Sequence, residues 1–455
     1  MRRSASLGLT LVASLAFELV GLGASGLVYS AFDPLVVSSG LTGNVLYQVK
    51  LTGSPTRVVL VLNALDGSTS NRALHDDGAN GDRVRGDGIF TTSLAASEVV
   101  DLLRPDDVFR AEVGFVEVYD GTTLAARGNV FADVLTDEIP LLPVVSLAAD
   151  AQRTDYVVNL VDRGFVLTNG FDITSVLRRF YDLVPDNCDF VNVIAVPGYF
   201  QNRYHFAVKS DVRGIGITPF DNSRTYGSAG RLMGITLFPN PVFFDLAEPG
   251  FQHELGHQWI NFLPFAPLNY VLPHWPLSDL ASGIMGFADT EGGQGLQFPC
   301  AVTPVAGGAT LAPRYDAPVF ADLDLYLMGL LPADQVGPHV VFPRGTQSSH
   351  LFSLCGAGTW LGQLQTVTIA DIVRQAGARV PDAAHSPHAF RVATIIVSPD
   401  GLLSREAMAF YSYFAQRVAA TEETPYHSGF AKGMAKPFYL STRGLGTLDA
   451  RMTSP

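Results

Sequence analysis

The stretch 249–259 reads PGFQHELGHQW and contains the pattern H-E-x-x-H at His253, Glu254 and His257. On a helix, positions i and i+4 lie on the same face, so the two imidazoles can bind one metal ion. Histidine pairs at this spacing are typical of zinc sites, and the glutamate between them can act as general base on a zinc-activated water. The stretch therefore predicts a helix that carries a zinc-dependent hydrolytic centre.

The surroundings of the motif indicate a buried amphipathic helix. Apolar residues recur at helical spacing, at Phe251, Leu255, Trp259 and Phe262. Pro249 suits a first turn, and Pro264 ends the helix soon after Phe262. The alternative is a surface helix that carries two histidines by chance, but a buried helix must pair its polar groups or bind metal with them. The pattern therefore favours the zinc site.

The third zinc ligand must come from outside this helix, because catalytic zinc usually takes three protein ligands and one water. His274 is the preferred candidate, since it lies in the stretch 272–276, LPHWP, whose prolines favour an extended loop. Imidazole also suits zinc. The alternatives are the downstream carboxylates of Glu291, Asp279 and Asp289. The predicted ligands are thus His253, His257 and one of these four residues.

The HELGHQW motif resembles that of the zincin superfamily of metallopeptidases. The stretch 282–287, SGIMGF, is similar to the Met-turn beneath the metal of metzincins, with Met285 as its methionine. However, Ile260 and Leu263 replace the glycine and histidine of the metzincin motif, and Pro276 stands where many gluzincins carry a glutamate. The chain is therefore similar to a divergent group of the superfamily. The stretch 323–330, LDLYLMGL, is interpreted as a further part of that group's signature.

This resemblance implies a peptidase that acts on a peptide or protein substrate, with a zinc-activated water and Glu254 as general base. It also implies that the strand 231–238 is the edge strand that holds an extended peptide. The candidate oxyanion donors are Tyr326, Tyr270 and His427, for each of which a structural role is the alternative. An alternative function is a catalytically inactive zincin-like domain that acts as an extracellular binding or adhesion protein, with a fourth ligand closing the zinc site. The intact Glu254 favours the enzyme.

Composition and the N-terminus indicate an exported protein. The 455 residues carry a net charge of −13, which argues against a nucleic-acid partner. Residues 1–30 have the pattern of a signal peptide: Arg2 and Arg3 precede an apolar run over 7–22 and small residues follow, although Glu18 interrupts the run. An uncleaved anchor or a buried N-terminal helix are the alternatives. No later stretch is long and apolar enough to span a membrane. We expect a secreted, cell-surface or periplasmic protein without a stable span in the mature chain.

Three cysteines, Cys188, Cys300 and Cys355, are too few for a disulfide-rich scaffold. In an exported protein they favour one disulfide and one free thiol. The preferred pair is Cys300 and Cys355, because both lie after the motif in loop-like sequence.

Residues 31–140 predict an all-β module. Runs of β-forming residues alternate with turn signals such as Asp66-Gly67 and Asp120-Gly121, as in a sandwich. The run 74–90, LHDDGANGDRVRGDGIF, resembles a signature of immunoglobulin-like β-sandwich modules in secreted and cell-surface bacterial proteins. Four of its carboxylates could bind calcium. They are Asp76, Asp77, Asp82 and Asp87. A pair of tight turns is the preferred alternative, because Asp and Gly are the residues that such turns require.

Residues 141–455 predict an α+β catalytic domain of zincin-like type. A helix over 173–183 and strands over 190–196, 203–209 and 231–238 precede the motif. A mainly helical remainder is expected after it, with one strand at 394–397 and a helix at 405–418. The whole chain is thus predicted to be multidomain, with an N-terminal immunoglobulin-like sandwich followed by an α+β zincin-like metallopeptidase domain.

Overall fold

The fold was analysed in a computed structural model. It describes residues 25–104, 109–137, 139–164, 172–197, 203–239, 250–288, 298–314, 316, 318–356, 358–422 and 436–452. Contacts between Cα atoms divide the chain into two compact units. The first comprises residues 1–33, 42–102 and 112–131, and the second comprises residues 34–41, 103–111 and 132–455. The chain is a multidomain α+β protein with a β-rich N-terminal region.

The N-terminal region contains two sheets. One has the order β1 (Gly26–Asp33), β3 (Asn44–Thr52) and β6 (Ile89–Ala95), all antiparallel. The other has the order β2 (Val36–Ser38), β8 (Thr123–Leu135), β7 (Phe109–Asp120), β4 (Arg57–Asn63) and β5 (Thr69–Leu74). The short helix α1 (Ala96–Val100) follows β6. Alternate residues of β3 are buried, as expected for a strand with one face in a core.

The predicted signal segment lies mostly outside the described residues, which begin at residue 25. Strand β1 starts at Gly26, which pairs with Thr52 in β3. The signal peptide over 1–30 stays a prediction.

The second unit is built on a mixed sheet whose four inner strands are parallel: β16 (Gly234–Pro239), β12 (Phe190–Ala195), β22 (Ala389–Ser398) and β11 (Val157–Val161). The strands β10 (Ala151–Arg153) and β9 (Val145–Ala148) extend it on one side, β13 (Tyr204–Ala207) closes the other, and β23 (Thr447–Asp449) pairs with the start of β22. Every residue of β12 is buried, as expected for a parallel strand covered on both faces.

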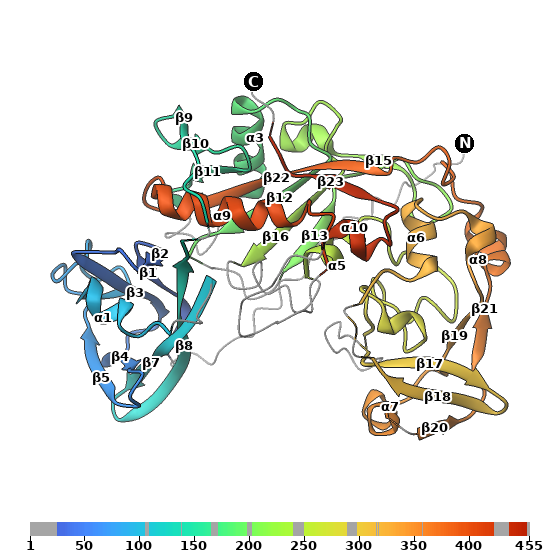
Figure 1. The fold of residues 1–455 in the computed structure, drawn as a ribbon, viewed down its shortest axis with the longest axis horizontal. Coiled ribbons are helices and arrows are strands. Elements are labelled where there is room, and N and C mark those ends of the chain that lie inside the picture. The colour runs from blue at the N-terminus through green and yellow to red at the C-terminus, as the bar shows by residue number, and fades with distance from the viewer. Residues whose placement is uncertain are drawn as a thin grey trace, which may run out of the picture. The chain divides into compact units, whose positions relative to one another are not determined.

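Helices cover the two faces of this sheet (Figure 1). Val191 and Val193 of β12 pack with α3 (Ile173–Leu183), which matches the predicted helix 173–183. Phe190 and Ile194, which point to the opposite face, pack with α9 (Arg405–Arg417) and with the residues of the H-E-x-x-H segment. The motif therefore lies on one face of a rigid parallel sheet.

The position of β16 contradicts one expectation. The stretch 231–238 was predicted to be the edge strand, but β16 pairs with β12 on one side and with β13 on the other. The edge is β13, which runs antiparallel to β16 through pairs such as His205 with Thr236. The run of β-forming residues predicted the strand correctly. However, β13, which precedes it in the chain, pairs with it and occupies the edge.

The region after the motif is not mainly helical. It contains the antiparallel sheet β17 (Cys300–Val305), β18 (Gly308–Pro313) and β20 (Gly358–Leu361), and the pair β19 (His339–Val341) and β21 (Gln365–Val367). Besides α9, its described α-helices are α6 (Asp322–Met328), α7 (Ser348–Leu354), α8 (Ile369–Ala376) and α10 (Phe438–Ser441). The first sheet has its own apolar cluster, which includes Phe298, Leu311 and Trp360. That local core explains why short strands are stable there.

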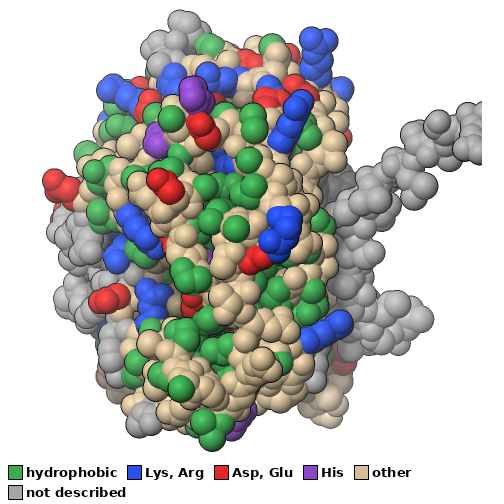
Figure 2. Space-filling model, turned by 90° about the vertical axis from the view of Figure 1, so that its right-hand side faces the viewer, with side chains coloured by type: hydrophobic (Ala, Val, Ile, Leu, Met, Phe, Trp, Pro, Cys, Tyr) green, Lys and Arg blue, Asp and Glu red, His purple; other side chains and the backbone are tan. Residues whose placement is uncertain are grey.

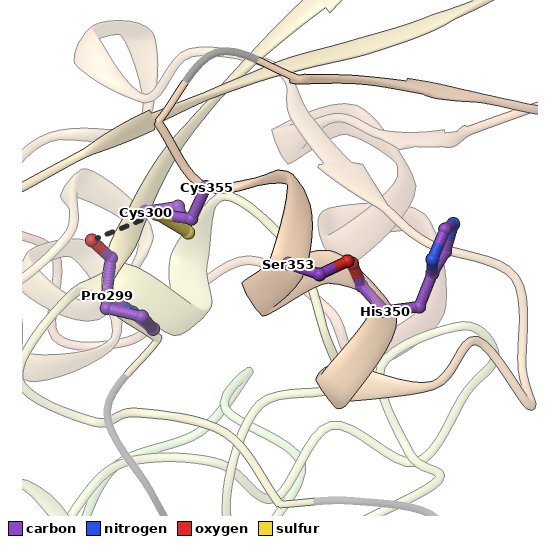
Figure 3. Close-up of a disulfide and its surroundings, with 5 residues drawn as sticks. All are labelled: Pro299, Cys300, His350, Ser353 and Cys355. Carbon is purple, nitrogen blue, oxygen red and sulfur yellow. Dashed lines mark hydrogen bonds between the residues drawn. A yellow bond between two sulfur atoms is a disulfide. The ribbon is translucent and has the colours of Figure 1, made fainter.

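The predicted disulfide is confirmed. Cys300 at the start of β17 is bonded to Cys355, which follows α7, across a sequence separation of 55 residues (Figure 3). Cys188 is a buried free thiol. The disulfide thus joins the small sheet to α7 at the position where the chain leaves that helix.

The described part of the chain contains no helix that is both long and apolar enough to cross a membrane. On the face drawn in Figure 2, basic and acidic side chains are interspersed, with apolar side chains scattered between them.

Replacing both disulfide cysteines by alanine should destabilise the second unit. Closing a loop of 55 residues reduces the entropy of the unfolded chain, which corresponds to about 4 kcal/mol at most. We expect a loss of about 2–4 kcal/mol in the free energy of unfolding. Denaturant unfolding followed by tryptophan fluorescence measures it, because Trp259, Trp275 and Trp360 all lie in this unit. The single variant Cys188→Ala is the control. Equal stability of the double variant and the wild type would contradict the expectation.

Candidate metal centre

The motif lies on a shorter helix than the sequence predicts. Helix α5 spans Gly250–Gly256, and the chain continues from His257 in turns rather than in further helix. The backbone N–H of Asn261 donates to Pro273 O, a carbonyl of the loop that follows, instead of to a helical partner. The helix therefore ends earlier than predicted, and the chain beyond it forms turns and then pairs with that loop. Phe251, Leu255 and Trp259 are buried as expected.

Three imidazoles meet at the end of this helix. The Nε2 atom of His253 lies 3.2 Å from that of His257 and 3.2 Å from that of His274. Together the three residues form a group whose ligand atoms all lie within 4.8 Å of one another. Of the predicted third ligands, the structure therefore brings His274 to the motif.

The other ring nitrogens fix which atoms of His253 and His257 carry a proton. The Nδ1 atom of His253 lies 2.8 Å from Ile284 O, and that of His257 lies 3.0 Å from Ile260 O. A carbonyl oxygen only accepts hydrogen bonds, so each Nδ1 must be the protonated nitrogen. In the neutral ring, both Nε2 atoms then carry a lone pair and no proton. Two lone pairs thus face each other at 3.2 Å.

Burial keeps these rings neutral. It lowers the pKa of His253 from 6.5 to about 3, with further lowering by the neighbouring His274 and Arg203. Burial also lowers the pKa of His257 well below its usual value, as do the charges of His253 and His274. The pKa of His274 is lowered by burial and by Arg203. Neutral imidazoles are the form that binds a metal ion.

The spacing of the nitrogens fits zinc. With Zn–N bonds of about 2.0–2.1 Å and tetrahedral angles, two ligand nitrogens are roughly 3.3 Å apart. The two observed distances of 3.2 Å agree with this value. The three histidines thus have the chemistry and the separation of a zinc-binding group, and a cation would remove the repulsion between the lone pairs of His253 and His257.

Asn261 holds the third-ligand loop against the end of the motif segment. Its side-chain amide donates to Leu268 O at 2.9 Å and to His274 O at 3.3 Å, and its Oδ1 accepts from Leu263 N at 3.0 Å. The residue is fully buried. Sequence reasoning missed it, because an asparagine beside a turn has no pattern that distinguishes it from an ordinary loop residue.

The stretch interpreted as a Met-turn lies against the motif helix. Ile284 O accepts the hydrogen bond from His253, and Met285 is fully buried. A Cβ atom on Gly256 would lie 2.4 Å from the Sδ atom of Met285, so a larger residue there would require the methionine side chain to move. The glycine inside the motif thus lets the turn pack closely enough to orient His253.

Glu254 points toward a cation rather than into the apolar core. Arg203 Nε lies 3.2 Å from Glu254 Oε1, and the two side chains are 21% and 7% exposed. Burial raises the pKa of Glu254 from 4.5 to about 7, whereas the charge and hydrogen bond of Arg203 act in the opposite direction. Arg203 directly precedes β13 and had no sequence signal that linked it to the motif.

The edge strand is joined to the motif through His205. Its Nδ1 lies 3.0 Å from Thr236 Oγ1 in β16, and its Nε2 lies 3.0 Å from Gln258 Oε1. Gln258 in turn donates to Lys209 O at 2.7 Å. These contacts fix the residues after His257 relative to the edge of the sheet.

The other predicted site residues lie elsewhere or outside the described part of the chain. Asp279 accepts a hydrogen bond from Val340 N at 3.1 Å and pairs with His339. The hydroxyl of Tyr326 accepts from Arg379 N at 3.1 Å, and Tyr270 lies under the guanidinium of Arg344. These contacts support the structural roles of the two tyrosines. Glu291, Asp289 and His427 are not among the described residues.

The aspartate run forms turns. Asp76 accepts backbone hydrogen bonds from Gly86 at 2.6 Å and Gly88 at 2.9 Å, and Asp82 accepts one from Gly78 at 2.6 Å. Carboxylate oxygens of Asp76, Asp82 and Asp87 come within 4.8 Å of one another, whereas Asp77 is not part of that group. These hydrogen bonds are the ones expected of aspartates in tight turns, so they explain why the carboxylates lie together. Calcium binding by this run stays a prediction.

Comparison with known proteins gives no relative: neither a family model, nor a curated protein, nor a solved structure matches this chain. The site must therefore be interpreted from its own geometry.

Replacing His274 by alanine should weaken zinc binding strongly. Loss of a ligand should cost more than the roughly 10- to 100-fold in affinity that is typical of changes outside the ligand set. Competition with a chromophoric chelator measures the affinity. Asp279→Asn is the matched control, because its contacts are made with His339 and Val340. A stronger effect of Asp279→Asn than of His274→Ala would reverse the assignment.

The His339 imidazole should make stability depend on pH. Its Nδ1 lies 3.1 Å from Asp279 and its Nε2 lies 3.0 Å from Asp322. Burial lowers the pKa of His339, but hydrogen bonds and charges of the two aspartates raise it overall from 6.5 to about 9. Because the folded-state pKa is the higher one, the stabilisation is complete below about pH 6.5 and is lost as pH rises through about 9.

We expect His339→Asn to lower the free energy of unfolding more at pH 6 than at pH 10, measured by denaturant titration at both values. His350→Asn, at an exposed position, is the control. An equal loss for His339→Asn at both pH values would show that the ion pairs contribute nothing.

Proposed function

We propose that this protein is a zinc metallopeptidase of zincin type, as the sequence resemblance implies. The observation that carries the proposal is the convergence of three neutral imidazole nitrogens beside a buried glutamate, with Nε2 atoms 3.2 Å apart. His253, His257 and His274 would hold the ion. Zinc at this position would supply a Lewis acid that polarises a carbonyl group and lowers the pKa of water.

Glu254 would act as general base and later as proton donor to the leaving amine. It neighbours His253 in the chain, and its carboxylate is buried, which excludes bulk water from around it. Arg203 holds Oε1 at 3.2 Å and thus limits the rotamers available to the carboxylate. The second oxygen is then the one oriented for proton transfer, a role that requires a hydrogen-bonding distance to the reacting group.

We propose β13 as the strand that binds an extended peptide. It is the edge of the central sheet, so among the described strands only β16 is paired with it. Main-chain groups on the edge strand of a sheet can pair with a substrate strand. Its residues Tyr204–Ala207 are half-buried, and Arg203, the partner of Glu254, directly precedes them. This arrangement would lead a bound peptide toward the catalytic glutamate.

The alternative function, an inactive binding protein with structural zinc, requires a different number of protein ligands at the site. A structural zinc takes four protein ligands. Within the described residues, the group around His253 contains three ligands, and Glu254 is retained next to them. Both facts favour the enzyme.

We further propose that the protein is exported and that its N-terminal region is an immunoglobulin-like accessory module. The Cys300–Cys355 disulfide supports export, because disulfides persist in oxidising compartments. The two sheets of the N-terminal region support the module.

The variant Glu254→Gln should retain zinc and lose peptidase activity. The amide has nearly the same shape but cannot accept the proton, and removal of a general base typically costs about 10²–10⁴ in rate. Hydrolysis of an unfolded protein substrate, together with the zinc content of each preparation, tests this. Glu406→Gln on α9 provides a control for loss of one acidic charge.

Two results would contradict the proposal. Equal activity of Glu254→Gln and wild type would exclude Glu254 as the base. Bound zinc without activity in either protein would favour the binding protein.

A further inference from the structure

Helix α6 carries a buried acid that the proposed chemistry does not use. Asp324 is fully buried, as are Leu323, Leu325 and Leu327 around it. A carboxylate in such surroundings is costly unless it is hydrogen-bonded. The stretch 323–330 was the block interpreted as part of the same signature as the motif, and its apolar residues alone would account only for core packing.

The partner of Asp324 belongs to the third-ligand loop. Its Oδ1 accepts a hydrogen bond of 2.8 Å from Nε1 of Trp275, the residue after His274. Its Oδ2 accepts one of 2.9 Å from Ala321 N at the start of α6. Both oxygens are thus engaged, one by the helix and one by the loop. Trp275 is itself fully buried, so the indole N–H has no access to water as an alternative acceptor.

We propose that Asp324 is a positioning residue of the metal centre, which holds His274 in place through the indole of Trp275. This inference rests on the metal-binding part of the proposed function and not on its catalytic part. Asn261 fixes the backbone of the same loop at His274 O, and Asp324 fixes the next side chain. Without the second contact, the loop would keep its backbone anchor but could rotate at Trp275.

A second acid of α6 reaches the same segment further on. Asp322 lies 3.0 Å from His339, which pairs with Asp279 at 3.1 Å. Asp324 thus contacts the loop directly, whereas Asp322 is linked to Asp279 only through His339. The buried Asp324 is difficult to explain by core packing, because an apolar residue at this position would avoid the desolvation of the carboxylate.

The experiment measures zinc affinity by chelator competition and the absorption spectrum of the cobalt-substituted protein. We expect Trp275→Phe and Asp324→Ala each to lower zinc affinity about 10-fold or more, as for groups that orient metal ligands. The two changes break the same hydrogen bond, so the double variant should lose much less than the sum of the two. The cobalt spectrum should change in each variant, since the geometry at His274 is altered.

The matched control is Asp189→Asn. Asp189 is a buried acid of the same unit that accepts from Arg391 N at 2.7 Å and pairs with Arg231, away from the loop. It should lower thermal stability and leave zinc affinity unchanged. If Asp324→Ala does not fold, Trp275→Phe and Asp324→Asn carry the test, because Trp275→Phe keeps a large ring and Asp324→Asn keeps one acceptor.

Unchanged zinc affinity and an unchanged cobalt spectrum in folded Trp275→Phe would overturn the inference. Zinc binding that depends on Asp324 in a protein without peptidase activity would uphold it while the catalytic proposal fails. A wild-type protein that binds no zinc would overturn both.

Discussion

The structure around the motif depends on one electrostatic constraint, which is the approach of the unprotonated Nε2 atoms of His253 and His257 to 3.2 Å. Lone pairs at that distance repel each other, and burial prevents the rings from relieving the repulsion by taking up a proton. The arrangement is stable only where surrounding groups fix each ring, or where a cation binds between them. The backbone carbonyls of Ile284 and Ile260 fix two of the rings, and the loop contacts fix the third.

The histidines lie on segments that differ in rigidity. Helix α5 packs on a sheet whose inner strands are buried on both faces, so His253 starts from a rigid support. His274 lies in a loop, and loops have no hydrogen-bond ladder to hold them. Two buried polar residues accordingly contact that loop: Asn261 binds its backbone, and Asp324 binds the side chain of Trp275. Polar groups are thus buried where packing alone would leave a ligand free to move.

Local sequence patterns were sufficient to predict the features that depend on neighbouring residues and on side-chain chemistry. Helical periodicity placed α3, the run of β-formers placed β12, and ligand chemistry selected His274 over Asp279. The errors concern interactions between distant segments. Beyond the end of α5 at Gly256, Asn261 pairs with Pro273 of the following loop, and the edge position of β13 depends on its pairing with β16. Arg203 and Asn261 have no motif, so only their contacts identify them.

The glutamate of the motif illustrates how the two kinds of information combine. From sequence, Glu254 is a base because it lies between two metal-binding histidines. In the structure its carboxylate is buried, which raises its pKa to about 7, while Arg203 at 3.2 Å favours its charged form. The guanidinium of Arg203, next to the edge strand, thus lowers the pKa of Glu254, whereas burial of the carboxylate raises it. Because Arg203 directly precedes the strand proposed to bind substrate, the residue that favours the charged form of the proposed base would also connect the proposed peptide-binding edge to it.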